Sequence, residues 1–307
     1  RTGIFSLFLS PIQVNYLGYP GTMGAGYIDY IIAAEFVIPE NYRQHYSEHV
    51  VWLPECFQGN DERRVIAGHV PSRAESGLPD SGFVFCAFNN SHKLTPAFFD
   101  IWVRLLIRVP ESVLWLVSND VEVERNLIAE AEKRGVAPQR LVFSPRIAYA
   151  EHLARLRLAD LFLDTLPFNA GTTASDALWA GVPVLTCAGE AFAARMAGSL
   201  LQALGLPELI THSLEDYEAL ALKLATTPTQ MTAIRARLAD RRLNSPLFDT
   251  ARFCRHLEAA YLGMWERQQS GRPPMTFSVA PLEAAIAPHS SLLQHETDVS
   301  SLPVLEG

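Results

Sequence analysis

The sequence contains little cysteine, and the few cysteines it has are far apart. Among its 307 residues there are four, Cys56, Cys86, Cys187 and Cys254, and none forms a CxxC pair. This spacing argues against the common zinc-binding patterns and against a disulfide-framed secreted domain. Scattered cysteines fit a reducing compartment, so we expect a cytoplasmic protein.

Basic charge is also scarce. The chain has 25 lysines and arginines against 33 aspartates and glutamates, which gives a formal net charge of -8. Nucleic-acid-binding domains usually carry a basic surface, so no nucleic-acid partner is expected. No stretch approaches the ~20 apolar residues that cross a bilayer, so no membrane partner is expected either. The apolar stretch 4–9 lacks the basic flank and the cleavage site of a signal peptide.

The sequence lacks an initiating methionine as well. It starts with Arg1 in the middle of an apolar pattern, and no repeat of solenoid length is visible in it. We therefore expect this chain to be the carboxyl-terminal part of a longer protein.

Apolar residues, in contrast, are abundant and regularly placed. Hydrophobic residues make up 49% of the chain and charged residues 19%, which is enough to bury a sizeable core. From Phe83 onward, apolar strands alternate with amphipathic helices, and this pattern is typical of a parallel sheet covered on both faces. The predicted strands are 83–88, 112–118, 140–145, 160–165, 182–187 and 208–212, and the predicted helices are 96–108, 122–134, 150–157, 173–180, 191–204 and 214–225.

The alternation divides the chain into segments of different character. Before residue 55 it shows only strands at 11–17 and 49–53 and a helix at 24–32, too little for a complete nucleotide-binding domain. The predicted segments are a remnant of an amino-terminal lobe (1–54), a polar inter-lobe linker (55–82), a complete Rossmann-like α/β lobe (83–245), a carboxyl-terminal helical region (246–267) and a largely disordered tail (268–307).

The most informative segment is the turn Asn169-Ala170-Gly171-Thr172-Thr173, which joins a strand to a helix. Ligands of open parallel sheets bind at the carboxyl ends of the strands, where a helix amino terminus holds phosphate. The amides of the glycine turn, the two threonine hydroxyls and the carboxylate of Asp176 suit a nucleotide diphosphate and its ribose. The alternative is a capping box with Thr173 as N-cap. Because a capping box does not account for Thr172 or for the preceding Asn-Ala-Gly, we favour a nucleotide-sugar site.

A histidine and an arginine are expected at the same edge of the sheet. His152 and Arg155 lie three residues apart on one predicted helix and therefore share a face. Spacing alone fits a solvated face. The helix, however, follows the strand that ends near Ser144, so we expect the pair to contact a base and a phosphate.

Lys93 follows the first strand of the complete lobe, in the loop CAFNNSHKLTP. A departing nucleoside diphosphate needs positive charge on its β-phosphate. Many sugar transferases supply this charge with a divalent metal held by a DxD motif, which the sequence lacks. We therefore expect Lys93 to supply it, without a metal. Asn89 and Asn90 offer further donors, although asparagine in such loops is more often a turn former.

Two other positions carry weaker signals. Asp164 closes a predicted strand and is expected to cap the turn that follows it. The segment Gly18-Tyr19-Pro20-Gly21-Thr22 resembles a strand-to-helix phosphate turn in the first lobe. A short glycine motif of this kind has low specificity by itself.

Several ordered blocks of the sequence resemble the catalytic region of O-GlcNAc transferase and its Spindly-type bacterial relatives. The resemblance covers about residues 10–267 and is more specific than any single motif. It implies a GT-B architecture, of which this chain carries one complete Rossmann-like donor lobe and a fragment of the amino-terminal lobe. The blocks are PIQVNYLGYPGTMGAGYIDYI, FCAFNNSHKLTP, RLVFSP, EHLARLRLADLFLDT, GTTASDALWAGVPVLT and SPLFDTARF.

The resemblance also implies a reaction and roles for the site residues. The reaction is inverting, metal-independent transfer of N-acetylglucosamine from UDP-GlcNAc to Ser or Thr of acceptor proteins, with no cofactor. The implied roles are neutralisation of the β-phosphate by Lys93, pyrophosphate contact by Asn90, phosphate binding by Thr172 and Thr173, ribose binding by Asp176, a place near the uridine for His152 and Arg155, and a place on the sugar and acceptor side for Gly18 and Pro20.

The chain departs from the family's pattern at two positions of the site. The family usually has a histidine where this chain has Gly171, which keeps the backbone approach to the donor but lacks the imidazole. Tyr149 stands where relatives often carry a lysine. The first half of the amino-terminal lobe and the tetratricopeptide repeats that normally precede it are not in this sequence. Two alternatives therefore stay open: a truncated, inactive nucleotide-binding module, and the same fold with UDP-glucose or GDP-fucose as donor.

Overall fold

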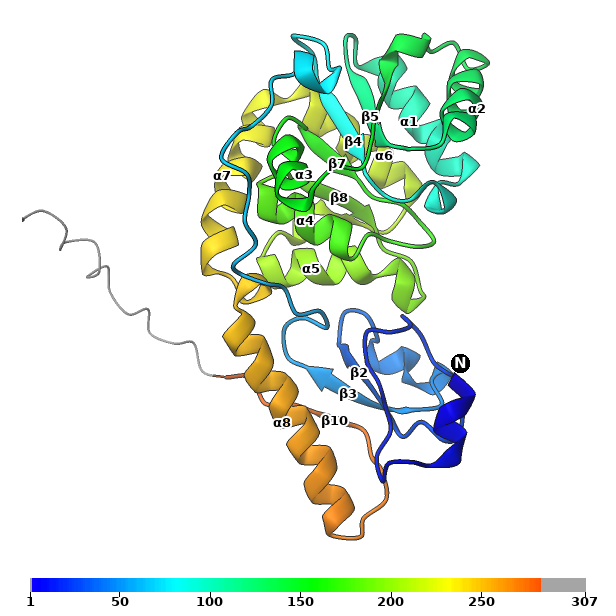
Figure 1. Cartoon of the computed structure of the whole chain (residues 1–307), viewed down its shortest axis with the longest axis vertical. Coiled ribbons are helices and arrows are strands. Elements are labelled where there is room, and N and C mark those ends of the chain that lie inside the picture. Colours follow the sequence, from blue (N-terminus) through cyan, green and yellow to red (C-terminus); the bar gives the residue numbers. More distant parts are fainter. Residues whose placement is uncertain (1, 283–307) are drawn as a thin grey trace, which may run out of the picture.

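The computed structural model describes residues 2–282, which form two lobes with one parallel β-sheet each (Figure 1). The first lobe contains four strands in the order β1-β2-β3-β10. Its two central strands, β2 and β3, are largely buried, and one face of the sheet packs against the long helix α8, Thr250–Gln269. The strands are β1 (Val14–Asn15), β2 (Tyr30–Ala34), β3 (His49–Leu53) and β10 (Phe277–Ser278).

The second lobe is built on six parallel strands in the order β6-β5-β4-β7-β8-β9. From β4 the chain moves outward through β5 and β6, then returns to the other side of β4 and continues from β7 to β9. The strand order therefore reverses between β4 and β7, the type of switch point where ligands bind in open α/β sheets. The strands are β4 (Val84–Ala87), β5 (Val113–Val117), β6 (Leu141–Ser144), β7 (Leu161–Leu163), β8 (Val184–Cys187) and β9 (Ile210–Thr211).

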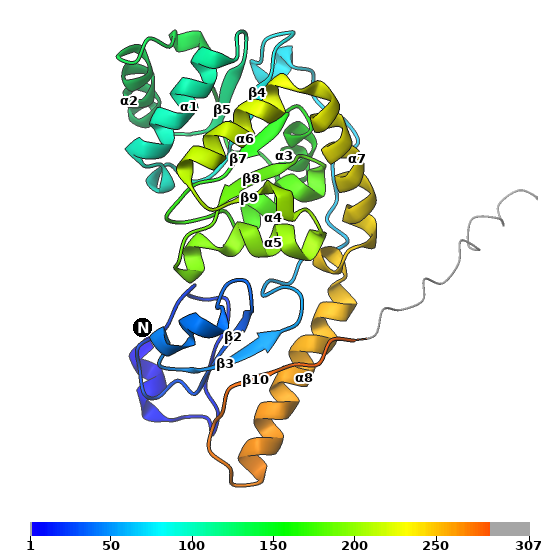
Figure 2. The ribbon, with the colours of Figure 1, turned by 180° about the vertical axis from the view of Figure 1, so that it is seen from behind.

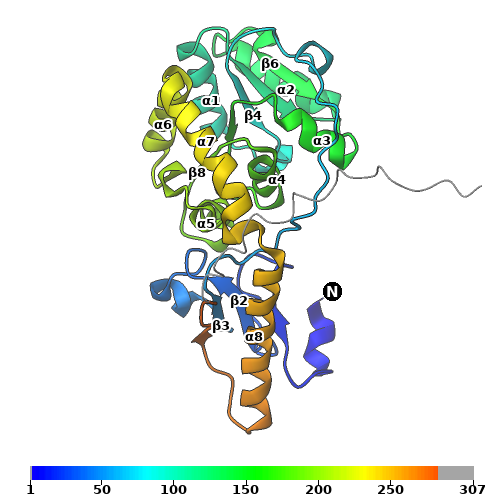
Figure 3. The same ribbon diagram turned by 90° about the vertical axis from the view of Figure 1, so that its left-hand side faces the viewer.

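Helices cover both faces of the second sheet, as the apolar strands require. Helices α1 and α6 pack together on one face, and α3 and α4 pack on the other (Figure 3). In α1 the predicted stripe Phe98, Trp102 and Leu105 is buried. The helices of this lobe are α1 (Pro96–Arg108), α2 (Val121–Glu132), α3 (Tyr149–Leu156), α4 (Thr172–Ala180), α5 (Met196–Leu204), α6 (Leu214–Thr226) and α7 (Pro228–Asn244).

The helix predicted at 24–32 is wrong. Residues 24–29 are not helical, and Tyr30–Ala34 is a strand whose five residues are all buried between β1 and β3. A short apolar run does not distinguish a buried strand from a buried helix by its periodicity. Here, pairing with β1 and β3 makes the apolar run a strand.

The tail also differs from the prediction of disorder over 268–307. Helix α8 continues to Gln269, and Phe277–Ser278 pairs with β3 as an edge strand. The side chain of Thr276 accepts a hydrogen bond from the backbone of Val50 at 3.1 Å, which fixes the start of this strand. Residues 283–307 lie outside the part of the chain that the structure describes. Within residues 2–282 no helix is long and apolar enough to span a membrane.

The two lobes contact each other beside α5, which lies between them (Figure 2). Arg195, at the start of α5, donates to the carbonyl oxygen of Phe36 in the first lobe at 2.6 Å and to that of Gly189 at 2.8 Å. A Cβ atom at Gly198 would lie 2.4 Å from the Phe36 ring, so glycine is required for this close approach. The contact holds the lobes together beside the cleft described next.

Candidate functional site

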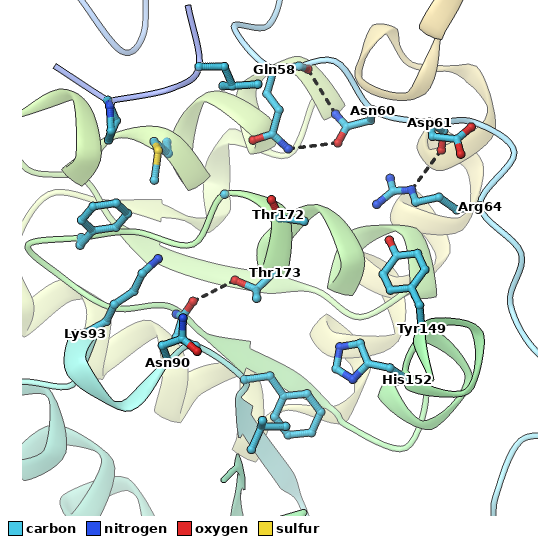
Figure 4. A pocket seen from close by; sticks show the side chains of 18 of the residues that line it. Gln58, Asn60, Asp61, Arg64, Asn90, Lys93, Tyr149, His152, Thr172 and Thr173 are labelled. Atoms are coloured by element: carbon cyan, nitrogen blue, oxygen red, sulfur yellow. Dashed lines mark hydrogen bonds between the residues drawn. The ribbon is translucent and has the colours of Figure 1, made fainter. Parts of the chain in front are cut away.

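A cleft of about 790 Å³ opens between the lobes at the switch point of the second sheet. The loops after β4 and β7, helix α3, the linker and one loop of the first lobe all contribute to its walls. Figure 4 shows that Lys93 and the paired threonines lie around the same pocket rather than on opposite sides of the lobe. The predicted site residues that line it are Gly18, Pro20, Asn90, Lys93, His152, Arg155, Gly171, Thr172 and Thr173.

The turn before α4 is held from below by Asp164, which is fully buried. Its carboxylate accepts hydrogen bonds from the Ala170 amide and from the Thr186 hydroxyl, both at 2.7 Å. Burial raises the pKa of Asp164 to about 6, against the effect of these hydrogen bonds. Asp164 therefore fixes the turn, as expected from its place at the end of a strand.

The helix after this turn begins two residues earlier than a capping box with Thr173 as N-cap would require. Helix α4 starts at Thr172 with Gly171 as N-cap, and no side chain caps it. The hydroxyl of Thr173 donates instead to the side-chain oxygen of Asn89 at 2.8 Å. The capping role for Thr173 is therefore wrong, and the amides of the first turn of α4 are not covered by a side-chain cap.

Lys93 connects the loops that follow β4 and β7. Its ammonium group donates to the backbone carbonyl of Asn169 at 2.9 Å and lies 4.2 Å from the centre of the Phe168 ring. Burial lowers the pKa of Lys93, while the charge of Asp164 raises it. Lys93 therefore places a partly buried positive charge beside Asn169, the first residue of the glycine turn.

His152 and Arg155 lie side by side on α3, as their spacing predicted. The guanidinium of Arg155 lies 3.1 Å from Nδ1 of His152 and donates to the carbonyl of Pro145 at 2.7 Å. Burial, with Arg155 and Arg146 nearby, lowers the pKa of His152 to about 4. The histidine is therefore neutral at pH 7.

Asp176 is the one predicted site residue that does not line the cleft. It is buried behind Arg64 and Tyr149, which both donate to its Oδ1, at 2.9 Å and 2.7 Å. Burial raises the pKa of Asp176, and the hydrogen bond from Tyr149 and the charge of Arg64 oppose this. A ligand in the cleft therefore meets Arg64 and Tyr149 before it reaches this carboxylate.

The first lobe contributes a loop that carries Gly18 and Pro20. Glu48, which is buried, accepts from the Thr22 hydroxyl and from the Met23 amide, both at 2.6 Å. The side chain of Asn15 donates to the carbonyl of Gly21 at 2.9 Å. These bonds hold the loop against its own lobe. The residues it presents to the cleft are apolar or glycine, whereas the second lobe presents the polar groups.

Sequence reasoning missed four polar residues of the linker that line the cleft: Gln58, Asn60, Asp61 and Arg64. Two of them have partners more than one hundred residues away, since Arg64 contacts Asp176 and Asn60 contacts Ser175. No spacing in the sequence signals such contacts. In the described residues no group of three His, Cys, Asp or Glu side chains is placed to hold a metal ion.

Comparison with solved structures identifies the class of this fold. The chain is 18% identical to WaaG, a glycosyltransferase involved in lipopolysaccharide biosynthesis, with a TM-score of 0.51 over 85% of this chain and 80% of that one. It is 30% identical to an O-GlcNAc transferase mutant, K341M, of Thermobaculum terrenum, with a TM-score of 0.79 over 87% of this chain and 51% of that one. One complete Rossmann-like lobe faces a smaller parallel-sheet lobe across the cleft, and with these neighbours the arrangement defines a GT-B glycosyltransferase fold.

The family follows from the sequence comparison. The chain belongs to glycosyl transferase family 41, whose model matches residues 1–70 and 66–257. It is 41% identical to the probable UDP-N-acetylglucosamine--peptide N-acetylglucosaminyltransferase SEC of Arabidopsis thaliana, over 91% of this chain. It is 33% identical to the probable SPINDLY enzyme of the same description from Petunia hybrida, over 89% of this chain. The chain spans 29% and 30% of the length of these two relatives.

Proposed function

We propose that this chain is the donor-binding part of an inverting, metal-independent glycosyltransferase that moves N-acetylglucosamine from UDP-GlcNAc to Ser or Thr of acceptor proteins. The observation that carries the proposal is the convergence of Lys93, Thr172 and Thr173 on one cleft at the switch point. Family membership and the printed activities of the relatives support the sugar and the protein acceptor. The unpaired cysteines fit a reaction in the cytoplasm.

Within this proposal each group has a task in the reaction. The uncapped amides of α4 and the hydroxyls of Thr172 and Thr173 bind the diphosphate, because a helix amino terminus favours negative charge. Lys93 stabilises the charge that develops on the β-phosphate as the glycosidic bond breaks. The partly buried position of its ammonium strengthens this interaction relative to one in open water.

The other end of the cleft is suited to the nucleoside. Neutral His152, ordered by Arg155, presents its ring next to Phe88, with the two ring centres 5.6 Å apart. The two rings are tilted by 36° to each other, and aromatic faces of this kind offer a base a surface for stacking. Tyr149 and Arg64 lie between this end and Asp176, so we place the ribose against them. Asn90, which accepts from Arg146, lies on the pyrophosphate side.

Substitution of the lysine tests the proposal. Lys93→Met in the full-length protein should reduce glycosyl transfer to a peptide by about a hundredfold or more, which is typical for the loss of one group that stabilises developing charge. A matched control is Lys133→Met, since Lys133 is exposed and pairs with Glu130 on α2. Equal activity of the Lys93→Met variant and the control would reject the mechanism.

An inactive nucleotide-binding module is the second candidate, favoured by Gly171 in place of the family's histidine. Calorimetry with UDP distinguishes this module from a scaffold that binds no nucleotide, because the module should bind UDP although it transfers no sugar. Competition among UDP-GlcNAc, UDP-glucose and GDP-fucose for the same cleft would distinguish the proposed donor from the two alternative donors.

A further inference from the structure

The linker places the side chains of Gln58, Asn60 and Arg64 against the first turns of α4. Gln58 is 9% exposed, Asn60 7%, and both line the cleft. The carboxamide oxygen of Gln58 lies 3.3 Å from the position that a Cβ atom would take at Gly171. The φ of Gly171 is -102°, outside the left-handed region that favours glycine. A side chain at this position would press against the end of the Gln58 side chain, which would have to shift slightly.

A chain of hydrogen bonds decides which end of the Gln58 amide faces the cleft. The guanidinium of Arg64, which can only donate, donates to the Ser175 hydroxyl at 3.1 Å. Ser175 in turn donates to Oδ1 of Asn60. The nitrogen of the same amide donates to the carbonyl of Leu247 at 3.0 Å, so the orientation of Asn60 is fixed at both of its ends.

The orientation of Asn60 then fixes that of Gln58. Because Oδ1 of Asn60 is an acceptor, the group that faces it must be Nε2 of Gln58, at 3.2 Å. The Gln58 oxygen is therefore turned toward Gly171 and the cleft. In the part of the chain that the structure describes, this oxygen accepts no hydrogen bond. Arg64 itself is locked, since it pairs with Asp176 and lies 5.3 Å from the ring centres of Trp179 and Phe248.

The unpartnered Gln58 oxygen is an acceptor, so it can bind only a ligand group that donates a hydrogen bond. Ionised phosphate oxygens are acceptors too and offer nothing for the Gln58 oxygen to bind. The hydroxyl groups and the acetamido N–H of a sugar are donors. Gly18 and Pro20, on the first-lobe side, line the same cleft. We infer that Gln58 is a specificity-determining residue that accepts a hydrogen bond from the donor sugar, with Arg64 as the residue that positions it through Ser175 and Asn60.

The inference rests on the proposed function and is tested by comparing two ligands. Gln58→Leu removes the acceptor with little change in volume. It should leave the Kd for UDP within about twofold, and it should weaken the binding of UDP-GlcNAc about three- to tenfold, as expected for one neutral hydrogen bond. Isothermal titration calorimetry on the full chain gives both constants. Gln44→Leu, which changes an exposed glutamine of the first lobe, is the control.

The possible outcomes distinguish a failure of the Gln58 role from a failure of the proposed function. Unchanged UDP affinity in the Gln58→Leu variant shows that the second lobe is folded, so a selective loss of UDP-GlcNAc binding supports the inference. An equal loss for both ligands, or no loss for either, overturns it while the proposed function stands. If the unvaried chain binds neither ligand, the proposed function fails and the inference with it. Like Gln58→Leu, Arg64→Met should lower the preference for UDP-GlcNAc over UDP. An unaltered preference would show that Arg64 does not position Gln58.

Discussion

The two lobes of this molecule are assembled in different ways. The second lobe is continuous in sequence, from β4 to α7, and its six strands follow a complete doubly wound order. The first lobe takes β10 and α8 from the far end of the chain to complete its small sheet. The second lobe therefore holds its own geometry, whereas the first depends on segments more than two hundred residues away.

The lobes also present different chemistry to the shared cleft. The second lobe contributes cationic, hydroxyl and amide groups, whereas the first contributes Gly18, Pro20 and the half-exposed Leu17. The buried Glu48 accepts from the Thr22 hydroxyl and from the Met23 amide and so holds that loop against its own lobe. The second lobe therefore gives the cleft its charged and polar groups, while the first lobe gives it an apolar wall.

The largest expected effect comes from removing the borrowed strand. A chain that ends at Ser270 loses the burial of Phe277 and Val279, which cover the first lobe's small core. Burying two such side chains contributes about 3–5 kcal/mol, so amides of β3 should lose much of their protection from hydrogen exchange. A chain that ends at Leu282 is the control. Equal loss of protection in both lobes would contradict the view that only the first lobe depends on β10.

A smaller effect is expected at the turn of the second lobe. Asp164→Ala leaves the buried amide of Ala170 and the hydroxyl of Thr186 without their partner. The cost should be about 3 kcal/mol in the free energy of unfolding, together with weaker UDP binding. Urea unfolding measures the first effect and calorimetry the second. Asp164→Asn keeps an acceptor for Ala170 and should cost clearly less; equal costs would mean that Asp164 does not act through these bonds.

The smallest effect concerns pH. The pKa of His152 in the folded chain is about 4, below the value of about 6.5 for an unfolded histidine, so the unfolded state binds the proton more tightly. This contribution to stability is complete above pH 6.5 and is lost as the pH falls toward 4. It should amount to about 1 kcal/mol, because the ring keeps part of its solvation.

The variant His152→Asn isolates this contribution from the other titrating groups. The raised pKa of Asp164 makes its own contribution to stability fall as the pH rises from 4 to 6, opposite to that of His152. The informative quantity is therefore the difference in the free energy of unfolding between the variant and the unvaried chain. That difference should shrink as the pH is lowered from 7 to 4. A difference that does not depend on pH would show that His152 titrates alike in both states.

The sequence predicted the second lobe well because its information is local. Continuous apolar strands and amphipathic helices placed α1, α3 and α4, and the carboxyl ends of the strands brought Lys93 and Thr172 to one edge. The same reasoning failed at Tyr30–Ala34, where a short apolar run fits either a helix or a strand. It also failed for residues 268–282, where pairing with β3 rather than composition produces order.

Periodicity and the resemblance to a family thus determined the class of fold, the edge of the sheet where ligands bind and most of the polar groups around the cleft. Only the tertiary structure decided that Asp176 lies behind Arg64 and Tyr149, and that Gln58 fills the space above Gly171. The physical reason is that hydrophobic periodicity repeats over a few residues and can be read locally. A hydrogen bond between the linker and α4 joins groups more than one hundred residues apart, and it exists only once both have been packed together.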